Sequence, residues 1–91
     1  MTDLRKLAKG RDCQIRLPGV CNFNPETTVL AHYRMAGLSG MGMKSPNLCA
    51  AWACSSCHAY VDTHRDDETA RAFLEGVMRT IGVLVKEGVL K

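Results

Sequence analysis

Four cysteines fall in two pairs that together could hold one metal ion. Cys54 and Cys57 form a C-x-x-C pair, and seven residues separate Cys13 from Cys21. Structural zinc is bound tetrahedrally by four ligands, with thiolate sulfurs at about 2.3 Å. The spacing predicts that these four cysteines bind one structural Zn²⁺. The alternative is that they are buried free cysteines, which behave as small apolar residues.

The fifth cysteine, Cys49, makes the count odd, which argues against a closed disulfide framework. Cys49 lies inside the apolar run from Leu48 to Cys54, so we expect it in the core. The N-terminal residues carry positive charge with no apolar stretch behind them, unlike a secretory signal. We therefore expect a cytoplasmic protein, where thiols stay reduced.

His58 directly follows Cys57 and precedes Asp62 by four residues. Residues four apart share one face of a helix, so an imidazole and a carboxylate could bind a divalent cation together. The alternative is an ordinary surface pair. Cys54 to His58 also completes C-x-x-C-H, the attachment motif of c-type haem. That motif accompanies export and would leave two cysteines unexplained, so the sequence predicts no haem.

The elements that must position these groups are short. Thr27–Tyr33 is rich in β-branched and apolar residues and predicts a strand with His32 near its end. Glycines at 37, 40 and 42 mark a loop, Leu48–Ala53 predicts a buried strand, and a short helix should run from Cys54 to Thr63.

The two ends of the chain also carry patterns. Asp3–Lys9 predicts a short helix closed by Gly10, and Cys13–Cys21 reads as a small hairpin around Pro18-Gly19. Asp66–Glu87 has apolar residues at i, i+3, i+4 spacing and predicts a long amphipathic helix. We expect an α+β fold. A helix this long could also contact a second copy and form a homodimer.

Length and charge narrow the class of protein. Ninety-one residues predict a single domain, 1–91, and no apolar run approaches the roughly 20 residues of a membrane span. The net charge is +3, and basic residues concentrate at the N-terminus. A basic end suits a phosphate backbone, although it can equally be a solvated face. We expect contacts to DNA from five residues: Arg5, Lys6, Lys9, Arg11 and Arg16.

Two stretches resemble the HNH nucleases, whose ββα-metal core places a histidine at a strand end before a metal-binding helix. These are Leu30-Ala31-His32 and Cys54-Ser55-Ser56-Cys57-His58. The closest members bind a structural zinc through two cysteine pairs, as in the phage junction-resolving endonuclease VII.

The similarity extends over most of the chain to the YbcO-type nuclease family of lambdoid prophages. It is carried by Asp3-Leu4-Arg5-Lys6, by residues 13–22, 24–27 and 30–32, and by Ala53-Cys54-Ser55 and Cys57-His58. The resemblance implies a prophage origin, a zinc-stapled HNH-like fold, and a DNA endonuclease acting in phage DNA recombination or processing.

The resemblance implies roles for individual residues. His32 would be the general base, and Asn47 would orient it. Arg34, two residues past His32, shares its sheet face if the strand continues, and there it would clamp the phosphate. His58 and Asp62 would hold a catalytic Mg²⁺, Mn²⁺ or Zn²⁺ ion.

One position departs from many HNH enzymes, which have a metal ligand just before the base histidine. Ala31 stands there, so either fewer side chains hold the ion or Asp62 substitutes for the missing ligand. The alternative function is a non-catalytic zinc module that binds DNA or a protein partner.

Overall fold

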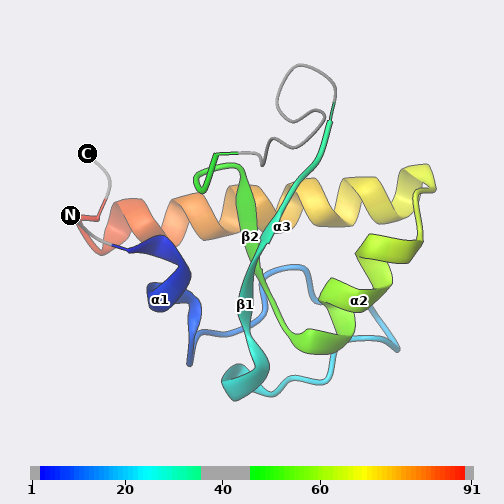
Figure 1. Cartoon of the computed structure of the whole chain (residues 1–91), viewed down its shortest axis with the longest axis horizontal. Helices are drawn as coiled ribbons and strands as arrows, with labels where there is room; N and C mark the ends of the chain where they lie inside the picture. The colour runs from blue at the N-terminus through cyan, green and yellow to red at the C-terminus, as the bar shows by residue number, and fades with distance from the viewer. Residues whose placement is uncertain (1–2, 36–45, 90–91) are drawn as a thin grey trace.

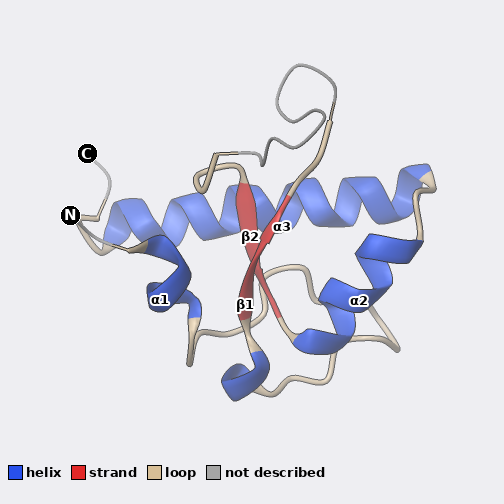
Figure 2. Cartoon of the chain, viewed as in Figure 1, coloured by secondary structure: helices blue, strands red, loops and turns tan. Residues whose placement is uncertain are grey.

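A computed structural model describes residues 3–35 and 46–89. The elements, drawn in Figures 1 and 2, are α1 (Leu4–Ala8), the short 3-10 helix η1 (Pro25–Thr27), β1 (Val29–His32), β2 (Ala50–Ala53), α2 (Ser55–Thr63) and α3 (Asp67–Lys86). This arrangement confirms the expected α+β class. The strands predicted at 27–33 and 48–53 and the three predicted helices are present, with slightly narrower bounds. The loop marked by glycines at 37, 40 and 42 lies outside the described residues.

The two strands form an antiparallel sheet in which His32 pairs with Ala50 and Val29 with Ala53. Every residue of β2 is buried, because β1 lies beside it and α3 crosses it (Figure 2). Alternate side chains of β2 enter two clusters, as strand geometry requires. Ala51 and Ala53 join the cluster around the cysteines, whereas Trp52 packs beside α1 and the end of α3.

Helix α3 supports both clusters. Its twenty residues extend about 30 Å, because an α-helix rises about 1.5 Å per residue. Phe73 and Val77 belong to the cysteine cluster and Leu84 to the other. The Asp66 side chain caps the helix by accepting a hydrogen bond from the Thr69 backbone N–H at 3.2 Å. The amphipathic helix predicted from periodicity is therefore confirmed.

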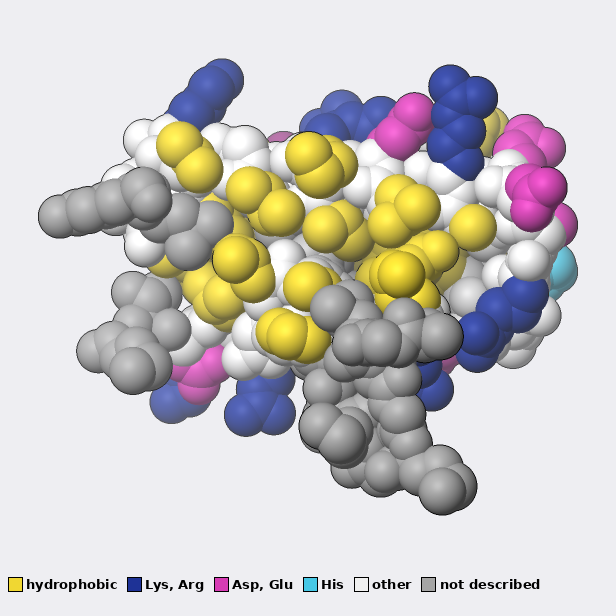
Figure 3. Space-filling model, turned by 90° about the horizontal axis from the view of Figure 1, so that it is seen from above, with side chains coloured by type: hydrophobic (Ala, Val, Ile, Leu, Met, Phe, Trp, Pro, Cys, Tyr) yellow, Lys and Arg dark blue, Asp and Glu magenta, His cyan; other side chains and the backbone are white. Residues whose placement is uncertain are grey.

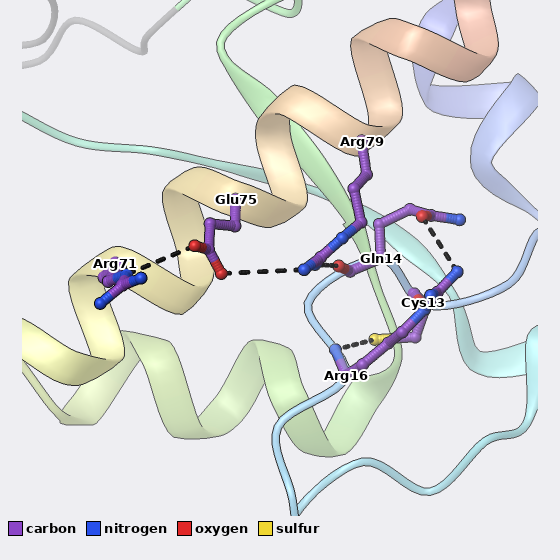
Figure 4. Close-up of polar contacts among 6 residues, drawn as sticks. All are labelled: Cys13, Gln14, Arg16, Arg71, Glu75 and Arg79. Carbon is purple, nitrogen blue, oxygen red and sulfur yellow. Dashed lines mark hydrogen bonds and ion pairs between the residues drawn. The ribbon is translucent and has the colours of Figure 1, made fainter.

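The hairpin predicted for residues 13–21 is wrong: the segment is a loop that ends in a turn at residues 17–21. The backbone groups of Gln14, which a hairpin would pair within the segment, bond to other elements instead. The Gln14 N–H donates to the carbonyl of Trp52 at 2.7 Å, and Arg79 of α3 donates to the Gln14 carbonyl at 2.6 Å (Figure 4). Alternating residue types predicted a strand here, but the backbone of Gln14 forms its hydrogen bonds with Trp52 of β2 and Arg79 of α3.

The same loop lies directly on α3 at Gly76. A Cβ atom at that position would be 2.8 Å from Cγ1 of Ile15 and 3.2 Å from the carbonyl oxygen of Gln14. Only a residue without a side chain permits this approach. Arg79 holds the loop through its hydrogen bond to Gln14. Glu75 forms an ion pair with Arg79 at 3.7 Å and accepts a hydrogen bond from Arg71 at 3.3 Å (Figure 4).

The face of α3 turned away from the sheet stays apolar. Leu74, Met78 and Val85 expose 44%, 66% and 54% of their surface, although they are hydrophobic. Figure 3 shows hydrophobic side chains gathered in a band over the helix. Within the described residues, no helix is long and apolar enough to cross a membrane.

Candidate functional site

The four paired cysteines meet at one point of the structure. Their sulfur atoms all lie within 4.8 Å of one another, and the sulfurs of Cys21 and Cys54 are 3.8 Å apart. A tetrahedral zinc with Zn–S bonds of about 2.3 Å separates its sulfurs by about 3.8 Å. The donor set and its spacing therefore fit one tetrahedral ion, and the four cysteines could bind a metal such as zinc.

The positions of these thiols follow from local structure. The Cys54 sulfur is the N-cap of α2 and accepts a hydrogen bond from the Cys57 N–H at 3.3 Å, so both thiols lie at the first turn. Cys13 comes from the loop anchored on α3, and Cys21 from the turn that closes that loop. The Asn22 side chain holds the turn to α2 by donating to Ser55 at 3.1 Å.

Hydrogen bonds and burial give the thiols different proton affinities. Burial opposes ionisation of Cys54, but N–H groups of Cys57 and Asn22 donate to its sulfur and lower its pKa to about 7. Burial raises the pKa of Cys57 and of Cys21. A group of buried thiols with one readily ionised member suits a cation, since a metal ion favours the thiolate form of each ligand.

Cys49 lies outside this cluster, as the sequence predicted, but the expectation that it lies in the core is wrong. It is half-buried just before β2, and its carbonyl accepts a hydrogen bond from the Tyr33 N–H at 2.9 Å. None of the five cysteines, all within the described residues, forms a disulfide.

His32, at the end of β1, lies next to Asn47, which precedes β2. The His32 Nε2 and Asn47 Oδ1 atoms are 2.7 Å apart. Because an amide oxygen only accepts, Nε2 carries the proton in this contact and Nδ1 is the nitrogen left with a lone pair. The sheet register brings the two residues together across fifteen positions of sequence.

A pocket of about 120 Å³ opens beside His32. Its walls come from the end of β1, the end of α2 and the start of α3, and Arg34 and Asp62 line it with His32. The sequence predicted a role for those three residues. It did not predict that His64 and Arg65 line the same pocket, because nothing local shows that the end of α2 turns toward β1.

His58 and Asp62 share one face of α2, as their spacing predicted. The His58 Nε2 and Asp62 Oδ2 atoms are 3.8 Å apart, and both side chains are accessible to solvent. An imidazole and a carboxylate at this separation could bind one divalent cation together. Ala31 is buried and packs in the cysteine cluster, so it contributes no ligand.

The N-terminal basic residues divide into two groups. Arg11 forms an ion pair with Glu87, with one N–O distance of 2.7 Å, and lies over the Trp52 ring. Arg16 donates to the Cys13 carbonyl at 3.1 Å. The other three line a shallow groove beside β1: Arg5, Lys6 and Lys9.

The chain is similar to known proteins over nearly its whole length. A family model described as "Putative nuclease YbcO" matches residues 2–89. Two relatives are 55% identical over 95 residues, covering 100% of this chain and 99% of each relative: "Putative nuclease YbcO" of Escherichia coli (strain K12) and "Putative nuclease ybcO" of Enterobacteria phage 82. A solved structure, "Structure of a putative bacteriophage protein from Escherichia coli str. K-12 substr. MG1655", is similar with a TM-score of 0.76 and 47% identity, covering 94% of this chain and 100% of that one.

Proposed function

Since this chain belongs to the YbcO family of nucleases, we propose that it is a metal-dependent endonuclease that hydrolyses phosphodiester bonds in DNA. The observation that carries the proposal is the His32–Asn47 contact of 2.7 Å at the edge of a pocket lined by Arg34 and Asp62. A relative from a phage supports a role in phage DNA recombination or processing, in the cytoplasm where that DNA lies.

His32 is the general base of this mechanism. Asn47 holds Nε2, so Nδ1 takes a proton from the attacking water. A neutral imidazole with one unprotonated ring nitrogen is a common general base. The water oxygen bonds to phosphorus opposite the 3′ oxygen, and the P–O3′ bond breaks. Arg34 contacts a non-bridging oxygen of the phosphate and balances its charge.

His58 and Asp62 are the residues that would hold the catalytic divalent ion, which is Mg²⁺, Mn²⁺ or Zn²⁺. When bound, that ion stabilises the negative charge that develops on phosphate oxygens during cleavage. Two side-chain donors suffice for an ion that keeps water molecules in its remaining positions. This assignment makes β1, β2 and α2 an HNH-like ββα-metal core.

The four-cysteine site has a separate, structural role in this proposal. It binds Zn²⁺ and joins the loop carrying Cys13 and Cys21 to the start of α2. A chain of 91 residues has a small core, and a structural metal supplies folding free energy to such domains. His58 follows the last zinc ligand directly, so the zinc site also fixes the helix that presents it.

The groove formed by Arg5, Lys6 and Lys9 gives the substrate a path. It lies beside Val29 and Leu30 of β1, the strand that ends at His32. Cations along the strand bind the DNA backbone without reading sequence. Arg11 and Arg16, which the sequence grouped with them, have protein partners and contribute at most to the local potential.

The exposed face of α3 supports a homodimer. Leu74, Met78, Ile81 and Val85 follow the 4-3-4 spacing of a coiled-coil seam. The same apolar seam on a second copy would match it, so we assign this face to pairing between two chains.

A second candidate function is a zinc module that binds DNA without cutting it. The observation in its favour is Ala31, which leaves the candidate ion with two side-chain ligands. Incubation of purified protein with supercoiled plasmid and Mg²⁺ or Mn²⁺ separates the two functions. The nuclease converts plasmid to nicked or linear DNA, and EDTA stops it. A binding module retards the plasmid and leaves it intact.

A further inference from the structure

The pocket beside His32 has a second arginine that the mechanism above does not use. Arg65 stands between α2 and α3 and lines this pocket, as does Arg34 from the chain beyond β1. Two positively charged side chains from separate parts of the fold therefore line the same pocket as the proposed general base. Its volume of about 120 Å³ is well below the roughly 300–1,000 Å³ of small-molecule sites, so its size suits a phosphate group and not a whole nucleotide.

The backbone on both sides of Arg65 is fixed by a helix cap. His64 is the C-cap of α2, and its ring stacks on Tyr60 with ring centroids 3.7 Å apart. Asp66 is the N-cap of α3, and its carboxylate accepts hydrogen bonds from the backbone N–H and the hydroxyl of Thr69 at 3.2 and 2.8 Å. Because Arg65 is the single residue between these two caps, its backbone has a defined position at the edge of the pocket.

The two pocket arginines have no hydrogen-bond or ion-pair partner among the described residues. Four other arginines have such partners: Arg11, Arg16, Arg71 and Arg79. The acidic residue of the pocket wall, Asp62, faces His58 at 3.8 Å and forms no ion pair with Arg65, which is three residues further on. Two unpaired guanidinium groups in one pocket repel each other and attract an anion, so the arrangement favours a bound phosphate.

We propose that Arg65 is a second phosphate-binding residue of the nuclease, and that Arg34 and Arg65 hold the scissile phosphate between them. The inference rests on the function proposed above. A guanidinium group presents its N–H donors as a planar fork that matches the oxygens of a phosphate. Donors from two separate elements fix the phosphorus atom relative to His32. They also balance the negative charge that develops on the non-bridging oxygens as water attacks.

The first test measures phosphate binding without catalysis and without an added divalent ion. Inorganic phosphate that binds the folded pocket raises the Tm of the parent above its value in chloride of equal ionic strength. Arg65→Ala should need about 10–100-fold more phosphate for the same shift, since it loses hydrogen bonds to a charged group. Arg71→Ala is the matched control, because Arg71 has the same charge, bonds to Glu75 and lies outside the pocket.

The second test measures cleavage of plasmid DNA in Mn²⁺ buffer. Arg65→Ala should cleave about 10–100-fold more slowly than the parent, and Arg65→Lys should lie between them, because lysine keeps the charge and loses the fork. Guanidinium chloride, at concentrations far below those that unfold the chain, should restore part of the activity of Arg65→Ala. Equal sodium chloride should not restore it, and Arg71→Ala should cleave like the parent. A merely structural role of Arg65 would show no such rescue.

Three outcomes overturn the inference. Equal phosphate-dependent Tm shifts in the parent and Arg65→Ala, or no shift in the parent, remove Arg65 from a phosphate site. Parental cleavage by Arg65→Ala shows that it does not hold the scissile phosphate. A parent that binds phosphate through Arg65 but cleaves no DNA refutes the proposed nuclease function, and with it the role of Arg65 in cleavage.

Discussion

The contact between α3 and the cysteine-bearing loop can be tested with two glycines of the same helix. Gly82 is exposed, and a Cβ there would have no neighbour within 4 Å. Alanine in a helix interior is about 0.8–1.0 kcal/mol more favourable than glycine, so Gly82→Ala should stabilise the fold by about that amount. For a domain of this size, that gain raises Tm by roughly 4–8 °C.

Gly76→Ala has the same intrinsic gain but meets the loop. Its Cβ would lie 2.8 Å from Cγ1 of Ile15 and 3.2 Å from both the Gln14 oxygen and the Ile15 Cα. The Ile15 side chain can rotate, but the backbone atoms cannot move without shifting Cys13, two residues away. Overpacking of this kind costs about 1–3 kcal/mol, so the net effect lies between about zero and 2 kcal/mol of destabilisation.

Thermal and urea denaturation of both variants, at one fixed zinc concentration, measures the difference. We expect Gly82→Ala to be more stable than Gly76→Ala by about 1–3 kcal/mol. We also expect weaker retention of zinc by Gly76→Ala under chelator, since the loop carries a ligand. Equal stabilisation by both substitutions would show that the loop does not lie on α3 as described.

Three further predictions concern charge and assembly. DNA affinity should fall steeply as salt concentration rises. Neutralising Arg5, Lys6 and Lys9 together should flatten the slope of log K against log[salt]. An unchanged slope would show that these residues form only a solvated face. The hydrogen bond from Arg11 holds the pKa of Glu87 below its usual range. The pair therefore stabilises the fold fully above the ordinary Glu pKa near 4.3. This stabilisation is lost as the pH falls through the lowered pKa of Glu87. In Glu87→Gln, the acid decline of Tm should therefore be shallower, and a decline identical to the parent's would contradict this. Met78→Glu should convert a dimer to a folded monomer in light scattering, and Tm should no longer depend on protein concentration. A parent that is monomeric at all concentrations refutes the dimer.

Much of the fold followed from pattern. Periodicity of 3.6 predicted α3, and runs of β-branched and apolar residues predicted the two strands, because these signals are local. The prediction for the segment around Gln14 was wrong because its structure depends on residues far away in the sequence. Its alternation resembled a strand, but its backbone partners, Trp52 and Arg79, lie 38 and 65 residues further along the chain, and no local signal identifies them.

In the candidate site, too, the residues with a local sequence signal were predicted and those that depend on distant contacts were not. C-x-x-C spacing and the position of His58 predicted which residues could bind metals, since ligand chemistry limits the choices. The contact of Asn47 with His32 was also expected. His64 and Arg65 were missed, because a histidine after a helix is usually a surface residue. Only the turn between α2 and α3 brings these two to the pocket.

In the proposed function, two neighbouring residues, Cys57 and His58, bind different metal ions and serve different purposes. The most direct test measures zinc content and plasmid cleavage on the same preparations of the parent, Cys57→Ser and His58→Ala, with Cys49→Ser as a control. We predict about one zinc per chain in the parent, in His58→Ala and in the control. His58→Ala should stay folded and lose cleavage, whereas Cys57→Ser should lose both zinc and fold. Loss of zinc from His58→Ala, or parental cleavage by it, would contradict the account.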